Sequence, residues 1–101
     1  MSQIAVITTN ELMEKLEAGE KLELVDVREH DEVAMGMIPG AKHIPMGDIP
    51  ASLGSFDKDK EYIMVCRSGS RSAYVCEFMQ AQGYKVRNMT GGMLDWRGKT
   101  E

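Results

Sequence analysis

Short strand-like and helix-like segments alternate along this chain. Residues 22–27 and 62–65 are runs with little polar alternation, which is typical of strands covered on both faces. Residues 72–82 follow the second run with apolar side chains at helical spacing. Parallel strands need a crossover between them, usually a helix. The sequence therefore predicts an α/β fold with a small, mostly parallel sheet that is flanked by helices on both sides.

The other predicted elements are shorter and are bounded by glycine, proline and capping residues. Thr8 and Glu11 have the spacing of a capping box, which predicts a helix after a strand over residues 4–7. We also expect strands over residues 42–44 and around residue 86, and short helices within residues 28–41, 49–56 and 93–96. No internal repeat, low-complexity tract or linker interrupts the sequence, so residues 1–101 are expected to form one domain.

Charge is distributed unevenly along the sequence. The net charge of −4 disfavours a nucleic-acid partner that is held by a broad basic surface. Residues 1–61 carry six Lys and Arg against thirteen Asp and Glu, whereas residues 62–101 carry six against three, a net of +3. An anion-binding site is therefore expected in the last two-fifths of the chain.

The sequence shows neither a membrane-spanning pattern nor an export signal. Its longest apolar run, residues 62–66, is far shorter than the roughly 20 residues that span a bilayer. Two cysteines are too few for a disulfide framework. We therefore expect a cytoplasmic protein with no membrane partner.

Residues 66–71, Cys-Arg-Ser-Gly-Ser-Arg, lie between a predicted buried strand and a predicted helix. A cysteine at this place meets the partial positive charge of a helix N-terminus, which favours the thiolate. The small residues of the loop allow its N–H groups to turn inward as an anion nest. The pattern favours a nucleophilic Cys66 whose pKa is lowered, more by Arg71 than by Arg67, although a cysteine after a strand is also often an inert core residue. The residues expected to bind the substrate are Arg67, Ser68, Gly69, Ser70 and Arg71.

Four segments, in this order, resemble the signatures of the single-domain rhodanese family. They are residues 24–29 (LVDVRE), residues 38–45 (IPGAKHIP), residues 62–71 (YIMVCRSGSR) and residues 91–96 (GGMLDW). The resemblance covers nearly the whole chain and implies a rhodanese fold with sulfurtransferase activity. It implies that Cys66 accepts a sulfane sulfur as a persulfide from a small anionic donor bound by residues 67–71. The sulfur would then pass to a small thiol or to a sulfur-accepting protein. We expect no cofactor and no metal ion.

The loop length distinguishes this chain from phosphatases that share the fold. Cell-cycle phosphatases carry five residues between the cysteine and the arginine, whereas four lie between Cys66 and Arg71. The shorter loop makes a tighter cradle, better matched to a sulfur atom than to a phosphoryl group. With Arg67 after the cysteine, the loop resembles that of thiosulfate-using sulfurtransferases. Mercaptopyruvate sulfurtransferases usually have glycine at this position. A thiolate phosphatase or arsenate reductase, and a non-catalytic module that only binds partners, are the alternatives.

Several other residues with chemically active side chains are interpreted as structural. Cys76 is predicted to be a small buried side chain of the helix that follows the loop, dispensable for chemistry. Asp26 is predicted to pair with an arginine or to cap a neighbouring loop at the end of its strand. Trp96 is predicted to anchor the core. His30 and His43 have no partner at metal-ligand spacing.

Three methionines could contribute to partner binding. Met37 stands where the rhodanese family usually has histidine, a departure that we interpret as structural. Met35, Met37 and Met46 are close in sequence and are expected to form an apolar rim where a sulfur-accepting protein docks.

Overall fold

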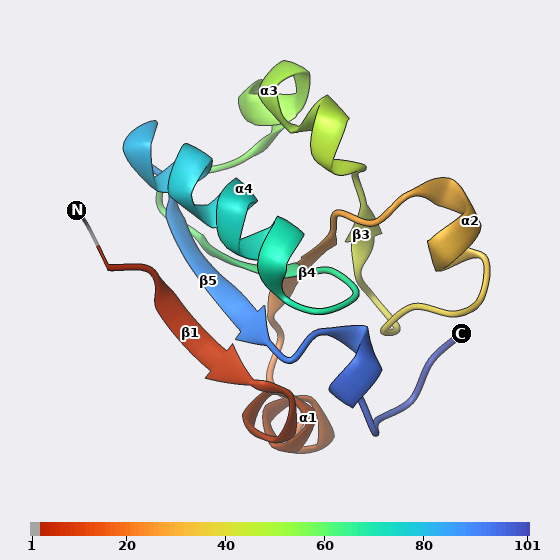
Figure 1. Cartoon of the computed structure of the whole chain (residues 1–101). Helices are drawn as coiled ribbons and strands as arrows, with labels where there is room; N and C mark the ends of the chain where they lie inside the picture. The colour runs from red at the N-terminus through yellow and green to blue at the C-terminus, as the bar shows by residue number, and fades with distance from the viewer. Residues whose placement is uncertain (1–2) are drawn as a thin grey trace.

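The computed structural model describes residues 3–101, which form a five-stranded sheet with helices on both faces (Figure 1). All strand pairs are parallel, in the order β1-β5-β4-β2-β3. The strands are β1 (Ala5–Thr8), β2 (Glu23–Asp26), β3 (Lys42–His43), β4 (Glu61–Val65) and β5 (Lys85–Thr90). The predicted α/β class, with a parallel sheet covered on both sides, is confirmed.

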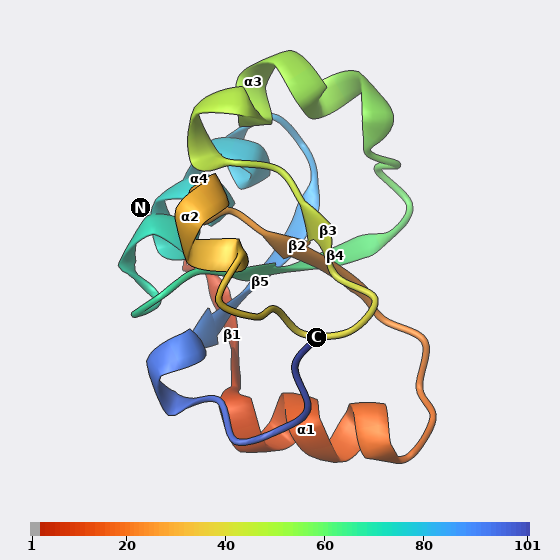
Figure 2. The same ribbon diagram turned by 90° about the vertical axis from the view of Figure 1, so that its right-hand side faces the viewer.

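The helices form a layer on each side of the sheet, which Figure 2 shows nearly edge-on. Helix α1 (Thr9–Glu17) covers one face, and helices α3 (Ile49–Ser52) and α4 (Ser70–Ala81) cover the other (Figure 2). The short helix α2 (His30–Val33) follows β2. Three single turns of 3₁₀ helix complete the described chain: η1 (Met46–Asp48), η2 (Leu53–Ser55) and η3 (Met93–Asp95).

The burial of both faces of strand β4 explains why its sequence shows no polar alternation. Tyr62 and Met64 belong to the core cluster that contains α4 residues, whereas Ile63 and Val65 belong to the cluster that contains Leu12 of α1. Successive side chains of a strand point to opposite faces, and here each face is covered by a helix. Both faces of β4 are therefore buried, which fixes the strand in the centre of the sheet.

The predicted capping box at the start of α1 is confirmed. The Glu11 N–H donates to the Thr8 hydroxyl oxygen at 3.1 Å, and the Thr8 N–H donates to the Glu11 carboxylate at 2.9 Å. The predicted start of α4 was wrong by two residues, because Gly69 adopts a φ of 100° and begins the helix at Ser70. The left-handed conformation of Gly69 is one that glycine adopts at little cost.

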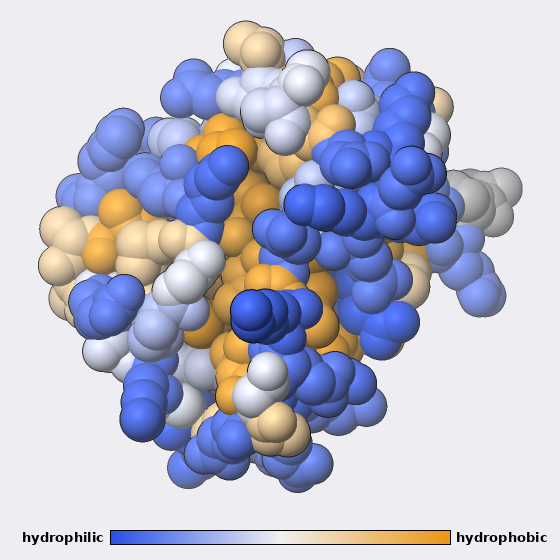
Figure 3. All heavy atoms as spheres, turned by 180° about the vertical axis from the view of Figure 1, so that it is seen from behind, coloured by the Kyte–Doolittle hydropathy of each residue, from blue (hydrophilic) through white to orange (hydrophobic). Residues whose placement is uncertain are grey.

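Hydrophobic side chains also reach the surface of the protein. On the side opposite to the view of Figure 1, a band of them lies between hydrophilic regions (Figure 3). Among residues 3–101, the large hydrophobic side chains that are exposed include Val6, Met35, Tyr74 and Leu94. Within the same residues, no helix is long and apolar enough to cross a membrane.

Candidate active site

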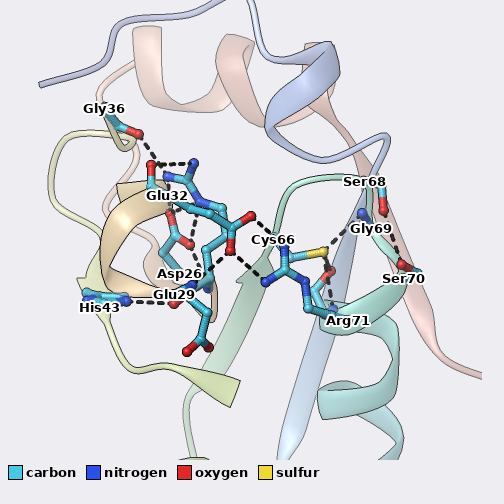
Figure 4. Close-up of polar contacts among 12 residues, drawn as sticks. Asp26, Glu29, Glu32, Gly36, His43, Cys66, Ser68, Gly69, Ser70 and Arg71 are labelled. Carbon is cyan, nitrogen blue, oxygen red and sulfur yellow. Dashed lines mark hydrogen bonds and ion pairs between the residues drawn. The ribbon is translucent and has the colours of Figure 1, made fainter. Parts of the chain in front are cut away.

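The loop that follows Cys66 begins where β4 ends and leads directly into α4. In the β2–β4 register Asp26 lies beside Val65, so the ends of these two strands meet at one edge of the sheet, as predicted. Figure 4 shows the Cys66 sulfur turned toward Gly69 and the start of α4. The carboxyl end of a parallel strand is where open α/β folds hold their ligands.

The segment after β5 packs tightly against this loop. The Met93 N–H donates to the Cys66 carbonyl at 2.8 Å, and the Leu94 N–H donates to the Arg67 carbonyl at 3.0 Å. Gly92 has a φ of 62°, and a Cβ atom there would overlap the Arg67 carbonyl oxygen. Glycine alone permits so close an approach of two backbones. The Gly-Gly sequence after β5 therefore holds the cysteine loop in place.

Three hydrogen-bond donors point at the sulfur of Cys66, a residue with 0% of its surface exposed. The Gly69 N–H lies 3.1 Å from Sγ, the Ser72 N–H 3.4 Å and the Ser72 hydroxyl 3.2 Å. Burial raises the pKa of the Cys66 thiol, but these hydrogen bonds, with a smaller contribution from the Ser68 backbone, outweigh burial and bring the pKa below its ordinary value. The loop therefore favours the thiolate, which is the nucleophilic form of cysteine.

Arg71 is paired with a carboxylate from another part of the chain. Its guanidinium donates two hydrogen bonds of 2.7 Å to Glu32 of α2 (Figure 4). This contact lowers the pKa of Glu32 to about 2 and raises the pKa of Arg71. Attraction to the Cys66 thiolate contributes less to the raised pKa of Arg71. Among the effects that lower the pKa of Cys66, the hydrogen bonds from Ser72 come first, so the donors of the loop contribute more than the charge of Arg71.

A second arginine links α2 to the sheet, and it confirms the predicted pairing of Asp26. The Arg28 guanidinium donates to both carboxylate oxygens of Asp26, at 2.8 to 3.1 Å, and both side chains are buried. Arg28 also donates to the Gly36 carbonyl at 2.8 Å, and its own carbonyl oxygen lies 2.7 Å from Nε2 of His43. Through these contacts α2, which carries Glu32, is held at the same edge as the cysteine.

A hollow of about 390 Å³ lies beside the loop. Arg67, Met93 and Leu94 form part of its wall, and Arg28, Glu32 and Met35 form the rest. The loop residues that were predicted to bind substrate differ in their exposure: Arg67, Ser68 and Ser70 are exposed, Arg71 is half-buried and Gly69 is buried. The hollow therefore combines an exposed cation with apolar walls.

Comparisons with known proteins agree with this geometry. Residues 8–99 match the family described as "Rhodanese-like domain". The chain belongs to the rhodanese-like domain family. It is 54% identical over 99 residues to the Bacillus subtilis protein named "Putative sulfurtransferase YtwF", covering 98% of this chain and 96% of that protein. It is 40% identical over 91 residues to a "Sulfurtransferase" of Allochromatium vinosum, covering 89% and 85% of the two chains.

A solved structure shares the whole fold. The crystal structure of a rhodanese-like domain protein from Staphylococcus aureus has a TM-score of 0.91 and 45% sequence identity, and the match covers 97% of each chain. Together with the named relatives, this similarity supports sulfurtransferase activity in general for this rhodanese domain.

Three residues of the candidate site were not found from the sequence. Glu32, Ser72 and Asn88 come from α2, α4 and β5. Glu32 had an indirect signal, because two arginines near a helix start are unfavourable unless a carboxylate compensates them. Ser72 and Asn88 carried no local signal, since serine and asparagine are ordinary residues in such segments.

The residues interpreted as structural have separate places in the domain. Cys76 is buried as predicted, and burial, with a smaller effect of the Cys66 charge, raises its pKa to about 12. Trp96 is half-buried and packs against the α1-side cluster, away from the hollow beside the loop. Met46 packs against the α4-side cluster, so only Met35 of the three methionines lines that hollow. The predicted docking of a partner on a rim of Met35, Met37 and Met46 stays a prediction.

Proposed function

We propose that this rhodanese domain moves a sulfane sulfur from a small anionic donor such as thiosulfate to a thiol or other nucleophilic acceptor, through a persulfide on Cys66. The main support is the set of three hydrogen bonds that converge on Sγ in a buried loop. These bonds stabilise a thiolate at the carboxyl end of β4. A module that only bound partners would have no use for them.

The first half-reaction loads the enzyme. The Cys66 thiolate attacks the outer sulfur of thiosulfate, a new S–S bond forms, and the S–S bond of the donor breaks. Sulfite leaves with the electron pair of that bond, so no oxidant is required. Arg67 is exposed within the loop and is suited to receive the donor, because no carboxylate among the described residues forms an ion pair with it as Glu32 does with Arg71.

The second half-reaction unloads the enzyme. An acceptor thiolate attacks the outer sulfur of the Cys66 persulfide, and Cys66 leaves as the thiolate. The hollow beside Arg67 offers the acceptor apolar contacts with Met35 and Leu94, which are 90% and 66% exposed. These walls suit a small organic thiol or a cysteine carried by a sulfur-accepting protein.

Intact mass spectrometry after incubation with thiosulfate tests this proposal. The wild-type protein should gain one sulfur atom and lose it when a thiol is added. Cys66→Ser should gain none, whereas Cys76→Ala should gain one as the wild type does. A phosphatase would instead remain unlabelled and hydrolyse aryl phosphates, and a binding module would do neither. Sulfur addition that persists in Cys66→Ser would refute the assignment of the nucleophile.

A further inference from the structure

A buried polar network lies behind the Cys66 sulfur. Ser72 is 0% exposed and Asn88 is 6% exposed. The Ser72 hydroxyl lies 3.2 Å from Sγ of Cys66 and 2.5 Å from Oδ1 of Asn88. Both of these atoms are acceptors when Cys66 is a thiolate, yet the hydroxyl has a single hydrogen to donate. The two acceptors therefore compete for one proton.

The orientation of the Asn88 amide is set by a second contact. Its Nδ2 donates to the Gly69 carbonyl at 3.1 Å. If the amide were turned over, its carbonyl oxygen would face the carbonyl oxygen of Gly69, and the two acceptors would repel each other. Oδ1 of Asn88 must therefore face Ser72, where it needs the hydroxyl hydrogen.

The preferred partner of the Ser72 hydroxyl follows the charge on sulfur. When Cys66 is a neutral thiol, the hydroxyl donates to Asn88, and the thiol hydrogen can point at the hydroxyl oxygen. When Cys66 is a thiolate, the hydroxyl donates to the stronger acceptor, Sγ. Oδ1 of Asn88 then lies buried without a donor, which is unfavourable.

We propose that Asn88 and Ser72 are positioning residues that respond to the charge on Cys66 and favour the sulfur-loaded enzyme over the free thiolate. In the persulfide the negative charge lies on the outer sulfur, one bond farther along the side chain than Sγ. The Ser72 hydroxyl is then free to return to Asn88, and the unpaired acceptor is satisfied. The part of this inference that concerns the loaded enzyme rests on the proposed persulfide function.

The charged groups around Cys66 do not supply this effect. Arg71 is attracted to the Cys66 thiolate, but its main partner is Glu32; Asp26 is paired with Arg28, and Cys76 stays protonated because its pKa is about 12. Arg67 is exposed to solvent. The groups that donate to Sγ within the described residues are Ser72 and the backbone of the loop.

Titration of Cys66 in single and double variants tests the competition. Alkylation rates are measured against pH in a Cys76→Ala background, which leaves one thiol. Asn88→Ala should lower the pKa of Cys66 by about one unit, a tenfold change in the thiolate equilibrium, because the hydroxyl is released to Sγ. Ser72→Ala should raise the pKa. Ser52→Ala, which removes a hydroxyl from α3 that donates to the Asp48 carbonyl, should leave the pKa unchanged.

The double variant separates competition from a structural role. In a Ser72→Ala background, Asn88→Ala should have no further effect on the pKa of Cys66, since no hydroxyl remains to be released. The Gly69 carbonyl keeps the Ala73 N–H as a donor at 3.2 Å, so the loop retains an anchor. An Asn88→Ala pKa that is unchanged or higher than that of the parent would overturn the inference.

NMR of the wild-type protein tests the inference even if the Asn88 and Ser72 variants do not fold. The NMR signals of the Asn88 side-chain amide should titrate with the midpoint of Cys66, and they should not titrate in Cys66→Ala. Loading with thiosulfate should return these signals toward their low-pH positions. Amide signals that stay constant through the Cys66 titration would overturn the inference. If the Asn88 amide signals titrate but mass spectrometry finds no sulfur added to the protein, the persulfide function is refuted. The competition between Sγ and Asn88 for the Ser72 hydroxyl would then still stand.

Discussion

Cys66 and Cys76 lie ten residues apart in the same buried cluster, and both are 0% exposed. Yet the pKa of Cys66 lies below its ordinary value, whereas the pKa of Cys76 is raised to about 12. The difference is the number of donors around each sulfur. Cys66 accepts hydrogen bonds from the backbone and hydroxyl of a helix start, while Cys76 lies within α4, where the N–H groups are already used. Burial alone does not make a cysteine inert.

Thiol alkylation at pH 8 offers the largest contrast between the two cysteines. Because the pKa of Cys76 is raised to about 12 and that of Cys66 is lowered from its ordinary value, Cys66 should have at least about a thousandfold larger thiolate fraction. Mass mapping should find alkylated Cys66 in the native protein, and alkylated Cys76 only after unfolding. Equal alkylation of both cysteines in the native protein would contradict the difference between their pKa values.

Substitution of Gly92 should raise the pKa of Cys66 toward that of Cys76. Gly92→Ala forces a Cβ atom against the Arg67 carbonyl and requires a φ of 62° that alanine rarely adopts. We expect a stability loss of roughly 3 kcal/mol, with a higher pKa of Cys66 because the loop donors move away. Urea unfolding and alkylation against pH measure the two effects.

Gly19→Ala is the matched control for this substitution. Gly19 has a φ of 84°, but a Cβ atom there meets nothing within 4 Å. This variant should cost about 1 kcal/mol through the backbone alone, with no change in the pKa of Cys66. An equal loss in the two variants would show that the close approach of the two backbones is unimportant.

Glu32→Gln tests how much the negative charge of Glu32, beyond its hydrogen bonds to Arg71, adds to the stability of the protein. The folded pKa of Glu32 is about 2, below its ordinary 4.5, so its stabilisation is complete above pH 4.5 and is lost as the pH falls toward 2. The variant should be about 1 kcal/mol less stable at pH 7, and this difference should shrink as the pH falls and vanish only below about pH 2. Asp31→Asn, at an exposed carboxylate of the same helix, should show no such pH dependence. Urea unfolding at several pH values measures this.

The same variant bears on Cys66. Without its carboxylate partner, the charge of Arg71 should lower the pKa of Cys66, but by less than Ser72→Ala raises it, since the donors dominate. A larger change in the pKa of Cys66 in Glu32→Gln than in Ser72→Ala would show that charge influences this pKa more than hydrogen bonding does.

Cys76→Ala should have the smallest effect. The side chain is buried in the α4-side cluster, and its removal should cost roughly 1 kcal/mol of stability. Sulfur transfer should remain within about twofold of the wild type, because Cys76 makes no contact with the reacting sulfur among the described hydrogen bonds. Formation of a Cys66–Cys76 disulfide during turnover would contradict this prediction.

The sequence by itself determined the features that depend on neighbouring residues. Periodicity placed the buried strands β2 and β4 and the helix α4, and the Thr8–Glu11 spacing placed the start of α1. The position of Cys66 between a strand and a helix predicted a lowered pKa, which the Ser72 hydroxyl and the N–H groups of the loop explain. Helix starts, strand ends and alternation are short-range properties, so a single sequence contains them.

Only the tertiary structure decided which distant side chains complete the site. Glu32 and Arg71 are 39 residues apart, and Ser72 and Asn88 are 16 apart. Their contacts arise because parallel pairing sets β4 beside both β2 and β5, which brings the segments after β2 and before α4 to one edge. The sequence therefore did not show that Arg71 pairs with Glu32, a carboxylate from a distant segment. It left Ser72 and Asn88 unnoticed, because nothing near them in the chain shows which atoms they will face.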